Sequence, residues 1–233
     1  NVNLDIHYGR RCLTMGNAIP YGGRVLDAFC INAAGGTSDA YLASAMRWSI
    51  NNGAKIVSIS IAQSTLLPAV EDVLAWAGAY DVIFFCAVGN ENVENMPAPA
   101  WYSQYWNYVH SVMSFDISRS RKSDFSNYGS FVTGAAPGEL VRSTSWDGSE
   151  TDWAGTSAAT PITAQLAARI MDTGVSARQA GAALKAGRRD FGQGVRQGGG
   201  VYSMARALRW LGKEPPITIT AGRPPAGGGW MAA

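Results

Sequence analysis

Residues 155–161, Gly-Thr-Ser-Ala-Ala-Thr-Pro, lead into the apolar run 158–171, which has the spacing of a buried helix. At the start of a helix the backbone N–H groups lack partners and the helix dipole is positive. A hydroxyl on Ser157 would meet groups that can stabilise a developing oxyanion, and the small Gly155 would let a carbonyl group approach the backbone closely. The alternative is that Thr156 or Ser157 only caps the helix.

Strand and helix patterns alternate along the rest of the chain. Apolar or β-branched runs predict strands at 24–31, 55–61, 82–88, 108–115 and 131–136. Amphipathic runs predict helices at 40–52, 67–79, 158–171, 176–186 and 202–211. Apolar strands separated by helices predict an α/β fold with three layers, in which a mostly parallel central sheet is covered by helices on both faces. Ligands of such sheets bind at the carboxyl ends of the strands.

The length and composition of the chain indicate its domain organisation and which classes of partner to expect. The chain has 233 residues, which suits one medium-sized domain. From Lys213 the sequence becomes rich in Pro and Gly. We therefore expect a domain at 1–212 and a tail or linker at 213–233.

The net charge is only +2 and basic residues are scattered, which gives no reason to expect a nucleic-acid partner. The densest basic cluster, Arg119, Arg121 and Lys122, is explained by a solvated loop. No apolar run is long enough to span a bilayer and no signal peptide is visible, so we expect no membrane partner.

The three cysteines, Cys12, Cys30 and Cys86, have no metal-ligand spacing and cannot all pair internally. Cys30 and Cys86 lie in apolar runs, where a free thiol packs as a small hydrophobic group. Unpaired thiols are typical of a reducing, cytoplasmic compartment, and secretion is the alternative, so the sequence leaves the localisation open. No dense acidic loop indicates calcium, and we predict no metal or other cofactor.

Two strand ends carry groups that suit a reactive site. Gly89 and Asn90 follow the strand predicted at 82–88, and a side-chain amide at a strand end can donate to an oxyanion. The alternative for Asn90 is an ordinary turn residue. Ser60-Ile61-Ala62 ends another strand and would leave backbone groups free to pair with an extended peptide, unless its own loop covers it.

The order of these segments resembles the subtilisin-like serine peptidases, the subtilase family, over about Ile19 to Gly212. The segments that carry the resemblance are 52–61, 85–91, 124–129, 136–138, 155–161 and 198–208. The resemblance implies a serine endopeptidase that cleaves extended peptide or protein substrates through an acyl-enzyme on Ser157. Asn90 and the Ser157 N–H would form the oxyanion hole, while Ser60, Ile61, Ala62 and Gly89 would line the peptide cleft.

A serine nucleophile also needs a base, usually a histidine oriented by a carboxylate. The family order is Asp, His, Ser, so His7 has the right relative position for the base, although Tyr8 follows it where the family has Gly-Thr. His110 comes after Asn90 and is expected in the core. Asp5 is only two positions from His7, too close to lie on a separate strand. The resemblance therefore implies that the Asp comes from an N-terminal segment or chain outside this sequence, whose missing strand would leave an exposed apolar sheet edge.

Other functions remain open at this point. The chain could be a catalytically silent subtilase-like scaffold that binds extended peptides, or an enzyme with a reduced Ser-His machinery. A transpeptidase is also compatible, because the exclusion of water depends on loops that the sequence does not define.

Overall fold

The computed structural model describes residues 2–3, 24–31, 36–145 and 147–213. Its main sheet has the strand order β2-β1-β3-β4-β5-β6, and β7 also pairs with β5. All pairs are parallel except β5 with β6. The strands are β1 (Val2–Asn3), β2 (Val25–Leu26), β3 (Ile56–Ile59), β4 (Ile83–Ala87), β5 (Val109–Asp116), β6 (Arg121–Lys122) and β7 (Gly134–Pro137). A separate antiparallel hairpin is formed by β8 (Val141–Thr144) and β9 (Glu150–Trp153).

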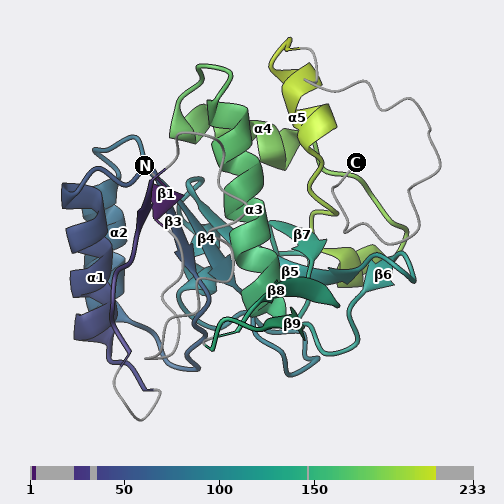
Figure 1. Cartoon of the computed structure of the whole chain (residues 1–233), viewed down its shortest axis with the longest axis horizontal. Coiled ribbons are helices and arrows are strands. Elements are labelled where there is room, and N and C mark those ends of the chain that lie inside the picture. Colours follow the sequence, from purple (N-terminus) through teal and green to yellow (C-terminus); the bar gives the residue numbers. More distant parts are fainter. Residues whose placement is uncertain (1, 4–23, 32–35, 146, 214–233) are drawn as a thin grey trace.

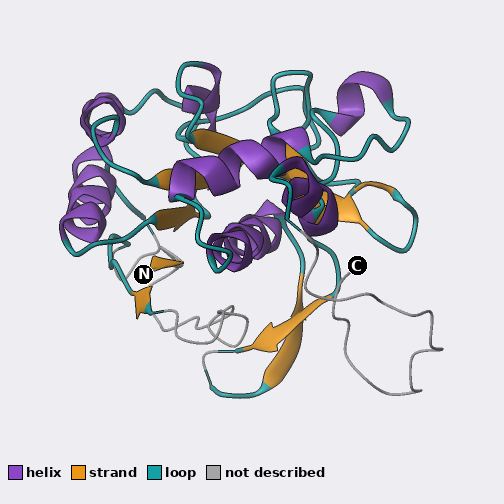
Figure 2. Ribbon diagram, turned by 90° about the horizontal axis from the view of Figure 1, so that it is seen from above, coloured by secondary structure: helices purple, strands orange, loops and turns teal. Residues whose placement is uncertain are grey.

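Helices cover both faces of the main sheet. The helices are α1 (Asp39–Asn51), α2 (Pro68–Ala77), α3 (Thr156–Met171), α4 (Ala177–Ala186) and α5 (Met204–Trp210), with 3-10 turns η2 (Ala100–Gln104) and η3 (Gly194–Gln197). Helices α1 and α2 pack together on one side, whereas α3 crosses β3, β4, β5 and β7 on the other (Figure 1; Figure 2). The predicted three-layer α/β fold with a mostly parallel sheet is thereby confirmed.

The core follows from the composition of the three central strands. Every residue of β3, β4 and β5 is buried. Strands that are covered on both faces favour apolar residues on both faces, and β4 is accordingly a continuous apolar run in the sequence. In β5 the polar residues His110, Ser111, Ser114 and Asp116 are buried among the apolar ones. At the periphery the sequence pattern is a poorer guide: the strand expected at 24–31 is reduced to β2, and no pattern predicts the β8–β9 hairpin. The tail at 213–233 lies, apart from Lys213, outside the described residues.

The first residues of the chain form part of the sheet. In β1, Val2 pairs with Val25 of β2 and with Ile56 of β3, and both pairings are parallel. The chain itself therefore occupies the position between β2 and β3, with a strand that the sequence pattern does not predict. Because β1 and β3 are parallel, the chain leaves β1 at the same edge of the sheet at which β3 ends.

Asp39 holds α1 and α2 together. It is the first residue of α1, after the N-cap Ser38. Its carboxylate, however, accepts the N–H groups of Ala69 and Val70 at 2.8 and 2.9 Å, at the start of α2, whose own N-cap residue Leu67 makes no side-chain cap. Asp39 therefore caps the neighbouring helix.

We expect Asp39→Ala to lower the free energy of unfolding by about 1–2 kcal/mol, the usual cost of losing a helix cap. The change is measured by urea denaturation at neutral pH. Asp72→Ala, an exposed carboxylate further along α2, is the matched control and should change stability by less than about 0.5 kcal/mol. Equal losses in the two variants would contradict the capping role.

Candidate functional site

Ser157 is the second residue of α3. The helix begins at Thr156, two residues earlier than predicted, and its N-cap is Gly155, with φ +137 and no side-chain cap. Neither Thr156 nor Ser157 is the capping residue, so the alternative interpretation of this segment is wrong. The Ser157 side chain is half-buried, and its N–H belongs to the first turn, where helix N–H groups lack partners within the helix.

Asn90 is joined by hydrogen bonds to Thr156, the residue that precedes Ser157 in the sequence. The Asn90 Oδ1 accepts the Thr156 N–H at 2.9 Å and the Thr156 hydroxyl at 3.1 Å. A backbone N–H can only donate, so the amide oxygen must face it and Nδ2 must face the other way. Nδ2 has no acceptor among the described residues. The end of β4 thus presents an amide donor beside the start of α3.

Ser60, which follows the end of β3, contacts Ser157 as well. The Ser60 hydroxyl donates to the Ser157 carbonyl at 3.0 Å, and the Ser157 hydroxyl lies 3.4 Å from the Ser60 carbonyl. Beyond it, the backbone groups of Ile61 and Ala62 make no hydrogen bond to any described residue. At Gln63 the chain pairs again, in an antiparallel bridge to Ala98. A short stretch of extended backbone is therefore available for pairing.

Gly89 and Asn127 fix the backbone on which Asn90 sits. Gly89 has φ +97, and a Cβ there would lie 2.5 Å from the Glu91 carboxylate and 2.6 Å from the Asn127 amide. The buried Asn127 donates to the Val88 carbonyl at 2.9 Å and accepts the N–H groups of Glu91 and Val93, both at 3.1 Å. The N–H of Gly89 is also committed, to the Thr156 hydroxyl at 3.3 Å.

Asn127 is a site residue that the sequence alone does not single out. The segment 126–129 has the composition of a structural loop, because Ser, Asn, Tyr and Gly are found together in many turns. The one signal that could identify Asn127 is its place in a segment that resembles the family.

His7 and Asp5 lie outside the described residues. His110 is in the core of β5, as expected: it is 1% exposed, its ring lies 5.1 Å from the ring of Phe85, and it packs against Gly181 of α4. Burial, with a smaller effect of Lys185 and Arg188, lowers the pKa of His110 to about 3. Neither ring nitrogen has a hydrogen-bond partner among the described residues.

Three further features of the described residues concern metal ligands, thiols and the length of the helices. In the described part of the chain no group of His, Cys, Asp and Glu side chains could hold a metal ion. Cys30 and Cys86 are buried free thiols, and desolvation raises the pKa of Cys30 to about 11. None of the described helices has the length and apolarity needed to cross a bilayer.

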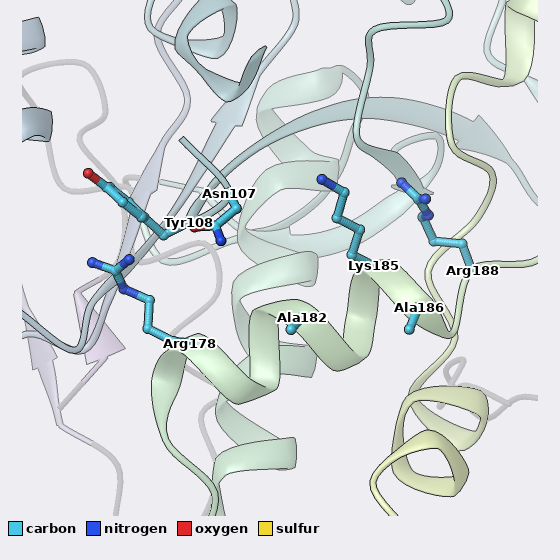
Figure 3. Close-up of a pocket in the computed structure, with 7 residues that line it drawn as sticks. All are labelled: Asn107, Tyr108, Arg178, Ala182, Lys185, Ala186 and Arg188. Carbon is cyan, nitrogen blue, oxygen red and sulfur yellow. The ribbon is translucent and has the colours of Figure 1, made fainter. Parts of the chain in front are cut away.

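A basic depression lies elsewhere on the molecule (Figure 3). Its lining residues are Asn107, Tyr108, Arg178, Ala182, Lys185, Ala186 and Arg188. Figure 3 shows Lys185 and Arg188 projecting side by side, with Asn107 between them and Arg178. Asn107 and Tyr108 precede β5, so the depression is at the amino end of that strand. Ser157 and Asn90 are at the opposite edge, where β3 and β4 end, and the two regions are separate.

The comparisons with known proteins agree with this geometry. The model of the subtilase (peptidase S8) family matches residues 23–186. Thermitase of Thermoactinomyces vulgaris is 32% identical over 162 residues, which cover 70% of this chain and 54% of thermitase. Alkaline elastase YaB of Bacillus sp. (strain YaB) is 32% identical over 150 residues, which cover 64% of this chain and 37% of the elastase. The chain thus spans about half or less of the length of these relatives.

Solved structures show the same fold. The prenylagaramide maturation protease PagA is 24% identical, with a TM-score of 0.70 over 81% of this chain and 73% of PagA. A cold adapted subtilisin-like serine proteinase is also 24% identical, with a TM-score of 0.66 over 77% of this chain and 65% of the proteinase. The family model covers well over half of the sequence, and the chain therefore belongs to the subtilase family of serine peptidases.

Proposed function

We propose that this chain is a serine endopeptidase that cleaves extended peptides through an acyl-enzyme on Ser157. The observation that supports this most strongly is the Thr156–Asn90 hydrogen bond, which joins segments 66 residues apart. It leaves an amide N–H group of Asn90, with no acceptor among the described residues, at the start of the helix that carries Ser157. We expect a bound carbonyl group to meet both this N–H group and the Ser157 hydroxyl.

The proposed chemistry uses these groups in sequence. The Ser157 Oγ attacks the substrate carbonyl carbon, and His7 takes the hydroxyl proton as general base. The oxyanion that forms accepts hydrogen bonds from the Ser157 N–H and the Asn90 Nδ2. The C–N bond then breaks, and the leaving amine takes the proton from His7. Water, deprotonated by His7, attacks the ester carbonyl of the acyl-enzyme. The C–Oγ bond then breaks, the acid product leaves, and His7 returns the proton to the Ser157 Oγ.

The carboxylate that orients His7 has two proposed sources. One is an N-terminal segment outside this sequence, as the resemblance implies. The other is Asp5, because β1 ends at the edge of the sheet that bears Ser60, and Asp5 follows Asn3 by two positions. If Asp5 has this role, Asp5→Asn should lower kcat at least about a hundredfold; if the carboxylate comes from outside, the variant should keep the activity of the parent chain.

Substrate would bind as an added strand. The backbone groups of Ile61 and Ala62, which no described residue pairs, support this, since an extended peptide can hydrogen-bond to them. Ser60 would place the end of this strand against Ser157, and Gly89 would support the cleft from below, where the Glu91 and Asn127 side chains leave no room for a Cβ.

A fluorophosphonate probe tests the proposal directly. The probe should label the full chain, and Ser157→Ala should abolish both labelling and peptide hydrolysis while leaving the melting temperature nearly unchanged. Ser130→Ala, at an exposed serine, is the control and should behave like the parent chain. A parent chain that is not labelled, alone or with an added N-terminal segment, would refute the enzyme and favour the silent peptide-binding module.

A further inference from the structure

Lys122 is buried, contrary to the solvated loop expected for its basic cluster. Its side chain is in β6 and the residue is only 5% exposed. The ammonium, with three N–H donors, lies within hydrogen-bond distance of four oxygens: Asn92 Oδ1 at 2.9 Å and the carbonyls of Ser123, Ser126 and Asp124 at 2.7, 2.7 and 3.3 Å. None of the ion pairs between described residues involves Lys122. Desolvation, helped by Arg196, lowers the pKa of this lysine. The oxygens that contact its ammonium belong to an amide and to backbone carbonyls, not to a carboxylate.

The oxygens around Lys122 come from two segments, 89–93 after β4 and 123–128 after β6. Backbone hydrogen bonds also join them: Asn92 N–H to the Phe125 carbonyl at 2.8 Å, Asn127 N–H to the Gly89 carbonyl at 3.1 Å, and Tyr128 N–H to the Val93 carbonyl at 3.1 Å. Asn90 lies inside the first segment. Its position therefore depends on how firmly the second segment holds the first.

We propose that Lys122 is a positioning residue for the oxyanion site, which it holds through Asn92. This inference rests on the proposed function. An oxyanion donor is effective only when it is already in place, because reorganisation during the reaction would cost free energy. Hydrogen bonds to a charged donor are roughly twice as strong as neutral ones, and a buried ammonium keeps that strength. The lysine thus acts as a bound cation would, but it is covalently attached and does not dissociate.

Asn92→Gly is the variant that isolates this role. Replacing Lys122 would strand several buried carbonyl groups and risks unfolding the chain. Asn92, in contrast, is exposed and has φ +57, a conformation that glycine adopts without strain, so the substitution removes the Oδ1 contact and keeps the backbone. We expect kcat to fall about tenfold with KM within about twofold, since a lost hydrogen bond to a charged group is worth at least this much.

Ser120→Gly is the matched control. Ser120 is also exposed and has φ +51, but it lies in the turn between β5 and β6, outside both segments. Ser120→Gly places glycine at a similar positive φ, as Asn92→Gly does, and should leave kcat unchanged. The specific test is then the double variant: in an Asn90→Ala background, Asn92→Gly should change kcat by less than about twofold. The same tenfold loss with and without Asn90 would overturn the proposal, as would an unchanged kcat in the single variant.

Hydrogen exchange separates this inference from the proposed function. The Thr156 N–H is bonded to Asn90 Oδ1, and its exchange rate reports on the position of Asn90 without any catalysis. We expect it to exchange about tenfold faster in Asn92→Gly than in Ser120→Gly under conditions where both variants remain folded. Faster exchange in a chain that hydrolyses nothing would refute the proposed function and support the positioning role. Equal exchange in both variants would overturn the positioning role whether or not the chain is active.

Discussion

Replacing Asn90 by Asp is expected to lower kcat by about two to three orders of magnitude, with little change in KM, which is the effect known for loss of the oxyanion-hole donor in subtilisin, a protein of the same family. The structural reason to expect it here is that Asp keeps the oxygen that accepts the Thr156 N–H and hydroxyl, but replaces the Nδ2 donor by a second, negative oxygen. The fold around Thr156 is preserved while the oxyanion meets repulsion in place of a hydrogen bond.

The comparison with Asn90→Ala makes this prediction specific. Alanine removes both the donor and the acceptor, so it should lower the melting temperature as well as kcat, whereas Asp should lower kcat without a comparable loss of stability. Steady-state hydrolysis of a peptide substrate and thermal unfolding measure the two effects. Full activity in Asn90→Asp would show that Nδ2 makes no contact with the reacting carbonyl group.

The three central strands are predictable from the sequence because they are fully buried, and burial favours apolar and β-branched residues. In β3, β4 and β5 all residues are buried, and apolar or β-branched residues at 55–61, 82–88 and 108–115 indicate these strands although polar residues such as His110 lie among them. The peripheral elements depend on other forces. In the β8–β9 hairpin the residues of β9 alternate between exposed and half-buried, and Arg142 of β8 pairs with Glu150 and Asp152 of β9. Its polar, short strands carry no apolar pattern to recognise.

The site is predictable only where chemistry requires a particular residue. Ser157 and Asn90 are predicted as site residues because a hydroxyl at a helix start and an amide at a strand end suit an oxyanion site, and because the resemblance to the family favours this role over a helix cap or an ordinary turn. Asn127 and Lys122 have none in isolation, since their roles arise from which backbone groups surround them after folding. Lys122 shows this clearly: its neighbours in sequence, Arg119 and Arg121, are paired with Asp124 at the surface, whereas Lys122 points inward.

His110 has a consequence for stability rather than for catalysis. Its ring is buried and neutral, and its pKa is about 3 in the folded chain against about 6.5 in an unfolded one. Below pH 6.5 the unfolded chain therefore binds a proton that the folded chain does not. The free energy of unfolding falls by about 1.4 kcal/mol per pH unit as the pH decreases from 6.5 towards 3.

Two carboxylates, Asp81 and Asp116, affect the free energy of unfolding at lower pH than His110 does. Burial opposes the ionisation of Asp81 and Asp116, but hydrogen bonds from backbone N–H groups, and from Ser118 to Asp116, outweigh it and lower the pKa of both. Their stabilisation is lost only as the pH falls through these lowered values, below the ordinary range of Asp. A measurement at pH 4.5 thus samples the effect of His110 with little contribution from these two groups.

We expect the parent chain to lose about 3 kcal/mol of unfolding free energy between pH 7.5 and pH 4.5 through His110, and His110→Leu to remove most of that loss. Leucine is neutral at every pH and leaves no unpaired ring nitrogen in the core, so at pH 7.5 the variant should remain within about 1.5 kcal/mol of the parent. Urea denaturation at the two pH values measures both quantities. Ser130→Ala, at an exposed serine, is the control and should retain the full acid sensitivity. If His110→Leu lost as much stability on acidification as the parent chain, the proton would be taken up elsewhere and the burial of a neutral His110 would not limit the stability of this fold in acid.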